Sequence, residues 1–540
     1  MDVQFWAATD VGKSRDHNED NFLVDKRLNL FIVCDGMGGH AAGEVASAVA
    51  VRAIRDVVAN NRDVFERCAV DNNDPALRQD MLRVLEYAIQ EACTRIFDMA
   101  QENPERRGMG TTCSLMVVAK RRCFIAHVGD SRIYLYRKGQ VHQLTEDHTL
   151  INEMMRRGRL QEADAVDAKY KNAITRAVGV YESVEVDTLD FDTLPGDRFM
   201  LCSDGLSGYL ELETISRYVA PRDPSSPPTQ EELKQITGEL IGFANECGGK
   251  DNITVVLVGL SEKGEDIETE DVQLTMETIR NIPLFHYLSY KELVRIVNVT
   301  QKRIVDAKEV LIREGEDGDE LFIIMRGKFL VERSGQEIAR LGPGRHFGEM
   351  ALIDDGPRSA TVRSLSAGTM LTIRRSEFYE LLRKDPTMAV KLLWNFIQTL
   401  SGRLREAPLP LSAAVPALPR RFENEPTGST RVPPSLVTQE IDLEAISGEA
   451  LTPPNLNALM PATLDQSEEL METIQNMERI TGEEITLPGL KVEGVNTPSK
   501  PEAPPRRRHH SGNRISSAIT SAPPTPSAPP LPSFNKSKDD

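Results

Sequence analysis

Acidic residues stand in small glycine-bearing turns at several places in the first half of the chain, and each turn adjoins a short apolar run. These residues are Asp35, Asp130, Asp204 and Asp251. One Asp-Gly turn means little, because this dipeptide is common in tight turns. Carboxylates at several strand ends, brought together by a fold, form a hard oxygen-ligand site that suits magnesium or manganese rather than zinc or copper. The first half therefore predicts a carboxylate metal site.

These carboxylates can meet only if the segments around them fold into one domain, and those segments mix strand and helix patterns. Runs rich in Val, Ile, Leu and Phe predict strands, and longer runs with an apolar face predict helices. The predicted strands are 30–34, 113–118, 123–128, 199–202 and 253–260, and the predicted helices are 41–58 and 81–100. The mixture predicts an α+β domain over residues 1–261.

The rest of the chain changes character twice. Residues 262–279 begin with an acidic stretch and are predicted to be a linker, whereas residues 280–405 alternate strand-like runs with glycine turns. That punctuation predicts a small β-roll with helices on either side. Residues 406–540, rich in proline, serine and threonine, cannot bury enough apolar surface to offset the entropy of ordering, so we predict a disordered tail. Its segments 464–480 and 506–508 could dock a partner, although most such islands have no specific role.

The overall composition argues against several classes of protein. The 540 residues are 40% hydrophobic, with a formal net charge of −18 and a sequence pI of about 5.2, unlike a general nucleic-acid binder. We expect no secretory signal and no membrane insertion, because no apolar run approaches the roughly 20 residues that span a bilayer. The seven cysteines form no Cys-x-x-Cys pair, which argues against a disulfide framework or a zinc site and favours the cytoplasm. Those in strand-like runs are expected to be buried thiols, namely Cys34, Cys113, Cys123 and Cys202.

The motifs of the first half, taken together, resemble those of the metal-dependent serine/threonine protein phosphatases of type 2C. The matching segments are Thr9-Asp10-Val11-Gly12 with Arg15, Asn18-Glu19-Asp20-Asn21, Asp35-Gly36-Met37-Gly38-Gly39, Gly108-Met109-Gly110-Thr111-Thr112, Gly129-Asp130-Ser131-Arg132, Thr145-Glu146-Asp147-His148, Ile174-Thr175-Arg176-Ala177-Val178-Gly179, Ser203-Asp204-Gly205 and Gly249-Lys250-Asp251-Asn252. The spelling Asp-Gly-Met-Gly-Gly is that of bacterial members. The resemblance implies an αββα sandwich that hydrolyses phosphoserine and phosphothreonine on proteins.

By this resemblance, Asp35, Asp204 and Asp251 hold two divalent ions, manganese or magnesium, with Asp35 as the bridging ligand. The charges agree, because carboxylates gathered in one cleft repel one another strongly unless cations join them. Gly36 gives its backbone carbonyl to a metal, which a residue without a side chain permits. Water between two metals is readily deprotonated and attacks phosphorus in line, without a covalent enzyme intermediate.

Other polar residues of these motifs have supporting roles in the same resemblance. Glu19 and Asp20 hold metal-bound waters or orient ligands, and Asp130 with Asp204 holds a third, weaker ion. Arg15 grips the phosphate oxygens through its planar guanidinium group. The alternative is a phosphatase fold that has lost its metals, but every ligand-type residue that the family requires is present.

Two parts of the expected site depart from the family or stay open. Where animal members have a histidine after the Asp-Gly pair, this chain has Met37, and His40 lies three residues on. His40 fits a cap or packing role better than that of a proton donor, which a metal-bound water could fill. Residues 150–169 are expected to form a flap over the cleft, and the basic run 156–159 could attract phosphorylated peptides or equally form a solvated face.

A second set of motifs resembles the phosphate-binding cassette of cyclic-nucleotide-binding domains. The matching runs are Phe347-Gly348-Glu349-Met350-Ala351-Leu352-Ile353 and Pro357-Arg358-Ser359-Ala360-Thr361-Val362. The roll around them and the helix after them match as well, over residues 280–405. The resemblance implies a ligand site made by Gly348, Glu349, Met350, Ala351, Arg358 and Ser359. On the last helix, Trp394 and Phe396 are candidates for an aromatic lid over the base, or for the core.

The residues of the cassette have separate tasks. Gly348 lets the backbone approach the ligand, and the amides after it open a short helix that favours an anion. Arg358 pairs with the cyclic phosphate, and Glu349 with the ribose 2′-hydroxyl. The alternative is that these two side chains pair with each other, although a buried arginine without an anion is costly. Ser359 adds a hydroxyl found with either base, and we favour cyclic AMP over cyclic GMP.

Together the two sites predict a cytoplasmic phosphatase that acts on phosphorylated serine/threonine proteins and is modulated by a cyclic nucleotide. The alternative is a constitutive phosphatase, or a pseudo-phosphatase, that acts as a cyclic-nucleotide sensor or adaptor. A transcription factor of the cyclic-AMP receptor type is disfavoured, because Pro408 and Pro410 stand where a helix-turn-helix would follow and the chain is acidic. The physiological substrate, the oligomeric state and a partner kinase docked by the tail are left open.

Overall fold

The computed structural model describes residues 1–38, 42–71, 74–156, 173–223, 226–262 and 267–406. All of these belong to one compact unit, Met1–Ile485. The predicted disordered tail lies outside the described residues, except for its first position. Among the described residues, no helix is long and apolar enough to cross a membrane.

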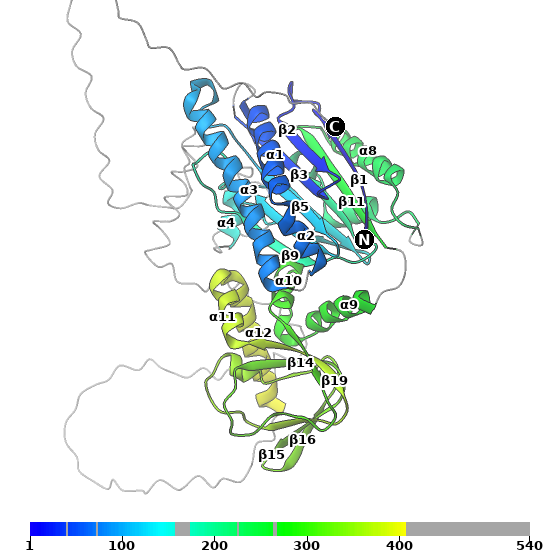
Figure 1. The fold of residues 1–540 in the computed structure, drawn as a ribbon, viewed down its shortest axis with the longest axis vertical. Coiled ribbons are helices and arrows are strands. Elements are labelled where there is room, and N and C mark those ends of the chain that lie inside the picture. The colour runs from blue at the N-terminus through cyan, green and yellow to red at the C-terminus, as the bar shows by residue number, and fades with distance from the viewer. Residues whose placement is uncertain (39–41, 72–73, 157–172, 224–225, 263–266, 407–540) are drawn as a thin grey trace, which may run out of the picture. The chain divides into compact units, whose positions relative to one another are not determined.

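Two antiparallel sheets form the centre of the first 261 residues (Figure 1). The first sheet has the order β1 (Asp2–Asp10), β11 (Ile253–Ser261), β10 (Arg198–Cys202), β7 (Arg132–Arg137) and β8 (Gln140–Gln143). The second sheet has the order β2 (Asp20–Asp25), β3 (Leu30–Met37), β5 (Cys113–Ala119), β6 (Arg122–Val128) and β9 (Asp187–Asp192), with β4 (Gly110–Thr111) paired to β3.

Side-chain alternation along the strands explains why the sheets are covered on both faces. In β3, Phe31 and Val33 pack between the sheets against Val256 and Val258 of β11. The residues that alternate with them, Leu30, Ile32 and Cys34, belong to the cluster that faces the helices. Successive side chains of a strand point to opposite faces, so continuous apolar runs are expected for strands buried on both sides.

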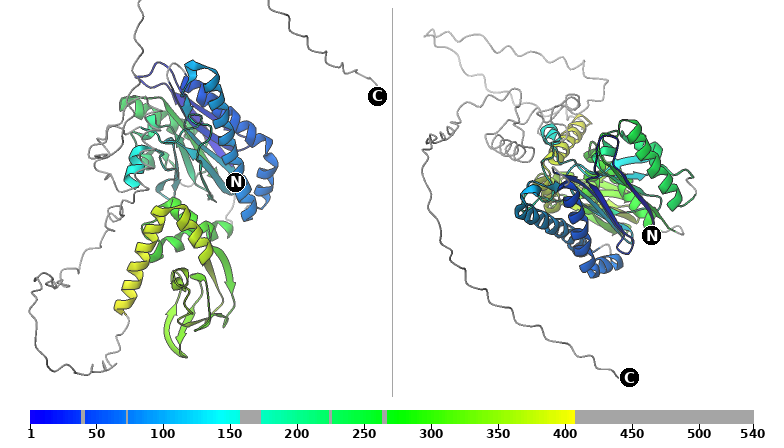
Figure 2. Two further views of the ribbon diagram at one scale, coloured as in Figure 1. Left: turned by 90° about the vertical axis from the view of Figure 1, so that its left-hand side faces the viewer. Right: turned by 90° about the horizontal axis from the view of Figure 1, so that it is seen from above.

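Helices cover the outer faces of both sheets, which gives an αββα sandwich. The helices over the second sheet are α1 (Ala42–Asn60), α2 (Arg62–Val70) and α3 (Pro75–Glu102), and those over the first are α7 (Leu212–Val219) and α8 (Gln230–Glu246). Shorter elements are η1 (Pro104–Arg106), α4 (Leu150–Arg156) and α6 (Asp204–Ser207). The right-hand view of Figure 2 shows the strands between the blue helices and the green helix α8. The predicted α+β sandwich is confirmed.

Helix α3 begins six residues before the predicted start at position 81, because Asp74 and Pro75 form its N-terminal cap. The Asp74 side chain accepts a hydrogen bond from the amide of Ala76 at 2.8 Å, and Pro75 is the first helical residue. An aspartate N-cap followed by proline is a typical helix start.

The second part of the chain forms a β-roll with flanking helices. One sheet has the order β12 (Gln301–Val305), β19 (Gly368–Arg374), β14 (Glu320–Arg326) and β17 (His346–Phe347). The other has the order β13 (Val310–Ile312), β18 (Thr361–Ser364), β15 (Phe329–Arg333) and β16 (Gln336–Leu341). The helices before it are α9 (Ile267–Arg280), η2 (Pro283–Phe285) and α10 (Tyr290–Asn298), and those within or after it are η3 (Glu349–Leu352), α11 (Arg375–Lys384) and α12 (Pro386–Glu406). Most of the segment predicted to be a linker therefore forms helix α9.

Aromatic side chains build the interior of this second part. Phe322 stacks on Phe347 inside the roll, with ring centroids 5.0 Å apart. Phe396 of α12 packs edge-on against Phe378 of α11 and is 2% exposed. Of the two aromatic candidates for a lid, Phe396 is thus a core residue, whereas Trp394 is partly exposed.

Candidate metal centre and nucleotide site

The layer between the two sheets changes from apolar to acidic at one end. In β3, Phe31 and Val33 fill this layer, and Asp35 is the next residue on the same face. In β2, Asp20 is the register partner of Asp35, as Phe22 is of Val33. The alternation that builds the core therefore brings two carboxylates side by side where the core ends.

Three further aspartates come to the same place. Asp204 follows β10 and opens α6, Asp251 precedes β11, and Asp130 lies in the turn between β6 and β7. Asp35 is repelled by each of them and by Asp20. The turns singled out in the sequence are thus gathered around Asp35.

Two threonines hold the backbone of Asp35. The Thr112 hydroxyl accepts a hydrogen bond from the Asp35 amide at 2.9 Å, and the Thr112 amide donates to the Asp35 carbonyl at 2.8 Å. The Thr111 hydroxyl donates to the same carbonyl at 2.8 Å. The Gly-Thr-Thr motif was predicted only as part of the family resemblance; two adjacent hydroxyls at the head of a buried strand were the signal for this supporting role.

The glycines of two Asp-Gly pairs are required by close backbone packing, although the structure places them in strand β3 and helix α6 rather than in the predicted turns. A Cβ atom on Gly36 would lie 2.1 Å from the carbonyl oxygen of Gly43. A Cβ atom on Gly205 would lie 2.0 Å from the carbonyl oxygen of Asn252. These distances are far below van der Waals contact, so neither position can hold a side chain without moving its neighbour.

The gathered carboxyl groups resist ionisation. Burial, followed by repulsion from Asp20 and Asp204, raises the pKa of Asp35 well above its ordinary value. Burial and then repulsion from Asp204 do the same for the pKa of Asp130. Burial raises the pKa of Asp20 to about 7, and burial with repulsion from Asp251 raises that of Asp204. Divalent cations remove such repulsion.

The donor atoms of this cluster fit metal ions better than they fit one another. The Oδ1 atoms of Asp20 and Asp204 are buried and have no hydrogen-bond partner among the described residues. In the described part of the chain, no three His, Cys, Asp or Glu side chains already form a set that could hold an ion. The carboxylate of Asp251 points instead to Arg15, whose Nη2 donates to its Oδ2 at 2.8 Å.

Arg15 and Glu19 stand at the rim of the cluster. The Arg15 side chain is 50% exposed, so much of its guanidinium group faces solvent although it is paired with Asp251. Burial raises the pKa of Glu19, with the charge of Arg15 opposing this effect. The arrangement leaves a cation beside the acidic cluster and open to a ligand.

Asn252 fixes three segments of the site and was missed as a functional residue. Its Oδ1 accepts a hydrogen bond from the Glu19 amide at 2.8 Å, and its Nδ2 donates to the carbonyls of Val11 and His17 at 3.0 and 2.9 Å. The side chain is 5% exposed. An amide at the start of an otherwise apolar strand was the signal for such a clamp.

A second polar group, formed by Ser114, His127 and Ser131, lies behind the acidic cluster. His127 Nδ1 and the Ser114 hydroxyl are 2.9 Å apart, and that hydroxyl donates to the Ser131 carbonyl at 2.7 Å. The Ser131 and Thr112 hydroxyls are 2.7 Å apart. Burial and the neighbouring His148 lower the pKa of His127 to about 3, so this ring is a neutral hydrogen-bonding group.

Only the start of the expected flap is described. A cavity of about 710 Å³ opens beside Asp130, Asp204 and Asp251, and Asn152 of helix α4 is among the residues that line it. Arg156 of α4 pairs with Glu146 and Glu153 at 3.2 and 3.7 Å, which favours the solvated face over a peptide anchor. Residues 157–169 and His40 lie outside the described residues.

In the second part of the chain, Arg358 and Gly348 lie against each other. Gly348 has φ +78°, and a Cβ atom there would lie 2.7 Å from Arg358 Nη1. The guanidinium group of Arg358 donates to the carbonyls of Gly348 and Glu320 at 3.3 and 2.9 Å. Its Nε atom is buried without a partner in the described part of the chain. Burial lowers the pKa of Arg358, against nearby carboxylates led by Glu320.

The predicted cassette residues line one cavity of about 560 Å³. They are Gly348, Glu349, Met350, Ala351, Arg358 and Ser359. Glu349 is 3% exposed, whereas Met350 and Ser359 are exposed. A buried cation with an unused donor, beside a glycine that allows close backbone approach, fits a bound anion.

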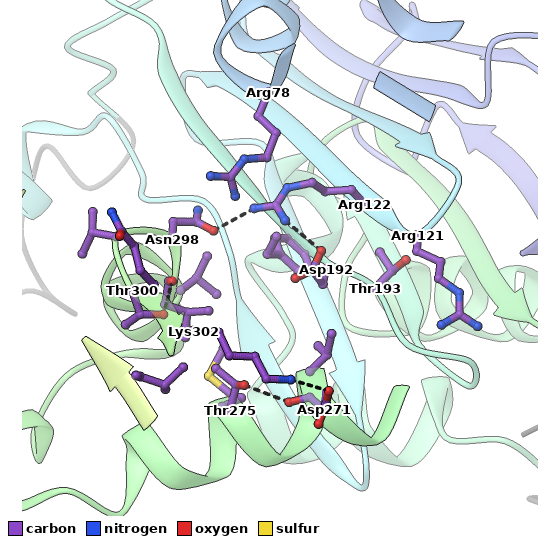
Figure 3. Close-up of a pocket in the computed structure, with 18 of the residues that line it drawn as sticks. Arg78, Arg121, Arg122, Asp192, Thr193, Asp271, Thr275, Asn298, Thr300 and Lys302 are labelled. Carbon is purple, nitrogen blue, oxygen red and sulfur yellow. Dashed lines mark hydrogen bonds and ion pairs between the residues drawn. The ribbon is translucent and has the colours of Figure 1, made fainter. Parts of the chain in front are cut away.

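A third cavity, of about 620 Å³, lies away from both sites and is shown in Figure 3. Four arginines line it, from positions 78, 121, 122 and 137. Their charges are met by acidic partners: Arg122, for example, donates to Asp190 at 2.6 Å and to Asp192 at 2.7 Å, and also to Asn298 of α10 at 2.8 Å. The cavity therefore lies at the contact between the phosphatase-like part and α10. It is not an anion site, because its arginines are already paired with acidic residues.

Comparison with known proteins identifies both parts of the chain. The sequence model of protein phosphatase 2C matches residues 12–240, and that of the cyclic nucleotide-binding domain matches residues 302–385. The serine/threonine phosphatase stp of Listeria welshimeri is 38% identical over 266 residues, which are 48% of this chain and 97% of that protein. This chain belongs to the protein phosphatase 2C family. The protein phosphatase PhpP of Streptococcus pneumoniae is 35% identical over 263 residues, 48% of this chain and 98% of PhpP.

Solved structures of phosphatases match a similar share of this type 2C phosphatase. The phosphatase PstP/Ppp of Mycobacterium tuberculosis has 32% identity, covers 48% of this chain and 99% of its own, and has a TM-score of 0.41. The catalytic domain of PstP, solved in complex with two manganese ions, has 32% identity and a TM-score of 0.39, with coverage of 48% of this chain and 99% of its own. The predictions of a protein phosphatase and of a cyclic-nucleotide-binding β-roll in one chain are confirmed by the two family matches.

Proposed function

We propose that this type 2C phosphatase hydrolyses phosphoserine and phosphothreonine on proteins with the help of two divalent ions, manganese or magnesium. The observation that carries the proposal is the group of buried and half-buried aspartates around Asp35, whose pKa values are raised by burial and by one another. Such a group is costly without cations and is a hard oxygen site with them. When bound, the ions lower the pKa of water and supply the nucleophile at neutral pH.

In this proposal the acidic turns divide the work of holding the ions. Asp35 would be the shared ligand, Asp204 and Asp251 would each contribute a carboxylate, and Gly36 would offer its carbonyl oxygen. Asp130 completes a third, weaker site with Asp204. The unpartnered Oδ1 atom of Asp204 supports its share in both sites.

The remaining residues orient water and substrate. Glu19 and Asp20 receive hydrogen bonds from water around the ions, which agrees with the buried, unpartnered Oδ1 of Asp20. Arg15 binds two oxygens of the phosphate through donors that are not engaged by Asp251, since half of its side chain is exposed. The proposal assigns no general acid, because His40 lies outside the described residues.

We further propose that the second part binds a cyclic nucleotide, with cyclic AMP favoured, and that binding modulates hydrolysis. The buried, unused Nε of Arg358 supports an anion beside Gly348, and Glu349 is at hand for the ribose. Coupling between two sites of one protein is typically about 1–3 kcal/mol, or roughly 5–150-fold, so we expect modulation rather than an absolute switch. A constitutive phosphatase that serves as a nucleotide sensor is the second candidate.

The test is hydrolysis of a phosphothreonine peptide, with and without manganese, across titrations of cyclic AMP and cyclic GMP. We expect metal-dependent turnover whose rate shifts with one nucleotide, and loss of turnover in Asp35→Asn. Asp98→Asn, on the exposed side of α3, is the matched control and should act as wild type. Full activity of Asp35→Asn would refute the bridging role, and a rate that ignores a nucleotide shown to bind would favour the sensor.

A further inference from the structure

Helix α10, which precedes the β-roll, contacts the phosphatase part at both of its ends. At its start, the Tyr290 ring stacks on His142 with centroids 4.2 Å apart, and its hydroxyl accepts a hydrogen bond from Arg137 at 2.5 Å. At its end, Asn298 Nδ2 donates to the Asp190 carbonyl at 2.7 Å. Lys291 therefore lies on a helix whose position against the phosphatase part is fixed at both ends.

Lys291 of this helix makes a buried ion pair with the phosphatase part. The side chain is 10% exposed, and its ammonium donates to Asp187 Oδ2 at 3.1 Å, with Glu146 Oε2 at 3.7 Å. A buried lysine loses its hydration, so it is tolerated only with a well-placed partner. Burial works against ionisation of Asp187, but His148 and Lys291 outweigh it and lower the pKa of this carboxyl.

Asp187 connects Lys291 to the turn that carries Asp130. The other carboxylate oxygen of Asp187 lies 3.5 Å from His148 Nε2. His148 in turn grips Gly129 from both sides: the Gly129 amide donates to His148 Nδ1 at 3.1 Å, and the His148 amide donates to the Gly129 carbonyl at 2.8 Å. Since Nδ1 accepts a hydrogen bond, the ring proton sits on Nε2, on the side of Asp187. Arg176 shares this place, because its Nη1 lies 3.4 Å from His148 Nε2 and 3.3 Å from the same Asp187 oxygen.

The turn held by His148 has little other freedom. Gly129 has φ +105°, in the region that favours glycine, and a Cβ atom there would lie 2.7 Å from the Thr112 side chain. Asp130 is the next residue and is 7% exposed. A displacement of His148 would therefore be passed to the Asp130 carboxylate rather than absorbed by the turn.

We propose that Lys291 is a positioning residue of the phosphatase metal centre, acting on Asp130 through Asp187, His148 and Gly129. The inference rests on the proposed role of Asp130 in metal binding. The sequence match to the phosphatase family ends at residue 240, so this support comes from outside the matched catalytic segment. Helix α10 of the nucleotide-binding part thus completes the support of the active site.

The neighbouring residues of Lys291 tie the same helix to the far end of the roll. Glu292 accepts hydrogen bonds from Lys391 of α12 at 2.9 and 3.0 Å, and Arg295 pairs with Asp385 at 2.6 Å. Of these consecutive residues, Lys291 therefore contacts Asp187 of the phosphatase part, and Glu292 contacts Lys391 of helix α12. This gives the proposed modulation a physical route that can be cut at one residue.

The test measures manganese binding by calorimetry on the full chain without nucleotide, alongside hydrolysis of a phosphothreonine peptide over a manganese titration. Lys291→Met should weaken the weakest manganese site about 3- to 10-fold, less than the roughly 10- to 100-fold that direct partners of ligands cost. Its turnover at saturating manganese should stay within about twofold of wild type, since the ligands themselves are intact. Lys291→Arg keeps the charge and should restore most of the affinity.

Lys138→Met is the matched control, because Lys138 also pairs across the two parts, with Glu277 of α9 at 3.2 Å, but both side chains are more than half exposed. It should bind manganese as wild type does. Asp187→Asn should reproduce the Lys291→Met effect, and the double variant should add little, which keeps the test valid if one variant folds poorly. Equal manganese affinity of wild type and Lys291→Met, or an equal loss in Lys138→Met, would overturn the inference. A wild-type protein that binds no manganese would overturn the proposed metal centre itself.

Discussion

Replacing Asp20 by asparagine should stabilise the metal-free protein at neutral and alkaline pH. Burial is the main cause that raises the pKa of Asp20 from 3.8 to about 7, with hydrogen bonds from Ser203 and Thr254 opposing it and repulsion from Asp204 adding to it. A folded pKa above the unfolded one means that the stability contributed by the protonated carboxyl is present below about pH 3.8 and is lost as the pH rises through 7.

The magnitude follows from the two pKa values. Each unit of pKa difference corresponds to about 1.4 kcal/mol, so full ionisation of Asp20 lowers the free energy of unfolding by roughly 4 kcal/mol at pH 8. Asparagine keeps the oxygen that accepts from Ser203 Oγ at 2.7 Å and removes the charge. We expect a gain of about 2–4 kcal/mol at pH 8, and of less than about 2 kcal/mol at pH 5, where much of the penalty is already relieved.

The assay is urea unfolding of the full chain in EDTA at both pH values. The chain has two tryptophans, so a Trp394→Phe background leaves Trp6 of β1 to report on the phosphatase part. Asp25→Asn, at the other end of β2, is the control with the opposite sign. Partial burial raises the pKa of Asp25, but the Arg55 hydrogen bond and backbone amides outweigh it and lower the pKa. This exposed pair should cost at most about 1 kcal/mol, more at pH 8 than in acid.

The reasoning fails if Asp20→Asn is no more stable than wild type at pH 8 in EDTA. It also fails if the gain is the same at pH 5 and pH 8, because a pH-independent gain would come from packing rather than from charge. Adding manganese should reduce the difference between the two proteins, since the Asp20 carboxylate would then accept hydrogen bonds from water around the ions and bound ions stabilise the folded state.

Two further substitutions test the turns and the cassette. Gly205→Ala should lower the free energy of unfolding by at least about 2 kcal/mol, because its Cβ would lie 2.0 Å from the Asn252 carbonyl oxygen. The control Gly238→Ala lies in open space on α8 and should raise the free energy of unfolding by about 0.5–1 kcal/mol. If urea unfolding showed the same change in stability for both variants, the packing argument would be wrong. Arg358→Ala should weaken cyclic AMP binding at least about 30-fold, since it removes charge-assisted hydrogen bonds worth roughly 2–3 kcal/mol in total. Calorimetry with the exposed Arg313→Ala as control would reject this role if both variants bound equally well.

The parts of the fold that could be predicted are those with a local hydrophobic pattern in the sequence. The buried strands of both sheets are continuous apolar runs, and the prediction of β3 from 30–34 needed only its Val, Ile, Leu and Phe content. Strand β1 was missed because Asp2–Asp10 mixes polar and apolar residues, and its place depends on pairing with β11 along its whole length. That pairing joins residues far apart in the sequence, which no local pattern reveals.

The two-residue periodicity of the strands could also have predicted the polar residues behind the site. Counting by twos from the inter-sheet residues reaches Ser114 in β5, then Thr112 just before that strand, and His127 in β6. All three lie on the face that carries Asp35. Periodicity alone thus marks the end of the core. Their hydrogen bonds, and the contact of Lys291 with Asp187, depend on tertiary geometry and could not be predicted.

The pairing of the first strand with the last strand of the phosphatase part has a practical consequence. Asp2 is the register partner of Ser261, and the amino group of Met1 lies 3.9 Å from Glu262. The two ends of the catalytic module therefore meet at one edge, so a short linker could join them and new ends could be opened in an exposed loop without disturbing either sheet. A module built this way can be inserted into another protein, or receive a sensor at either end, at the same point in space.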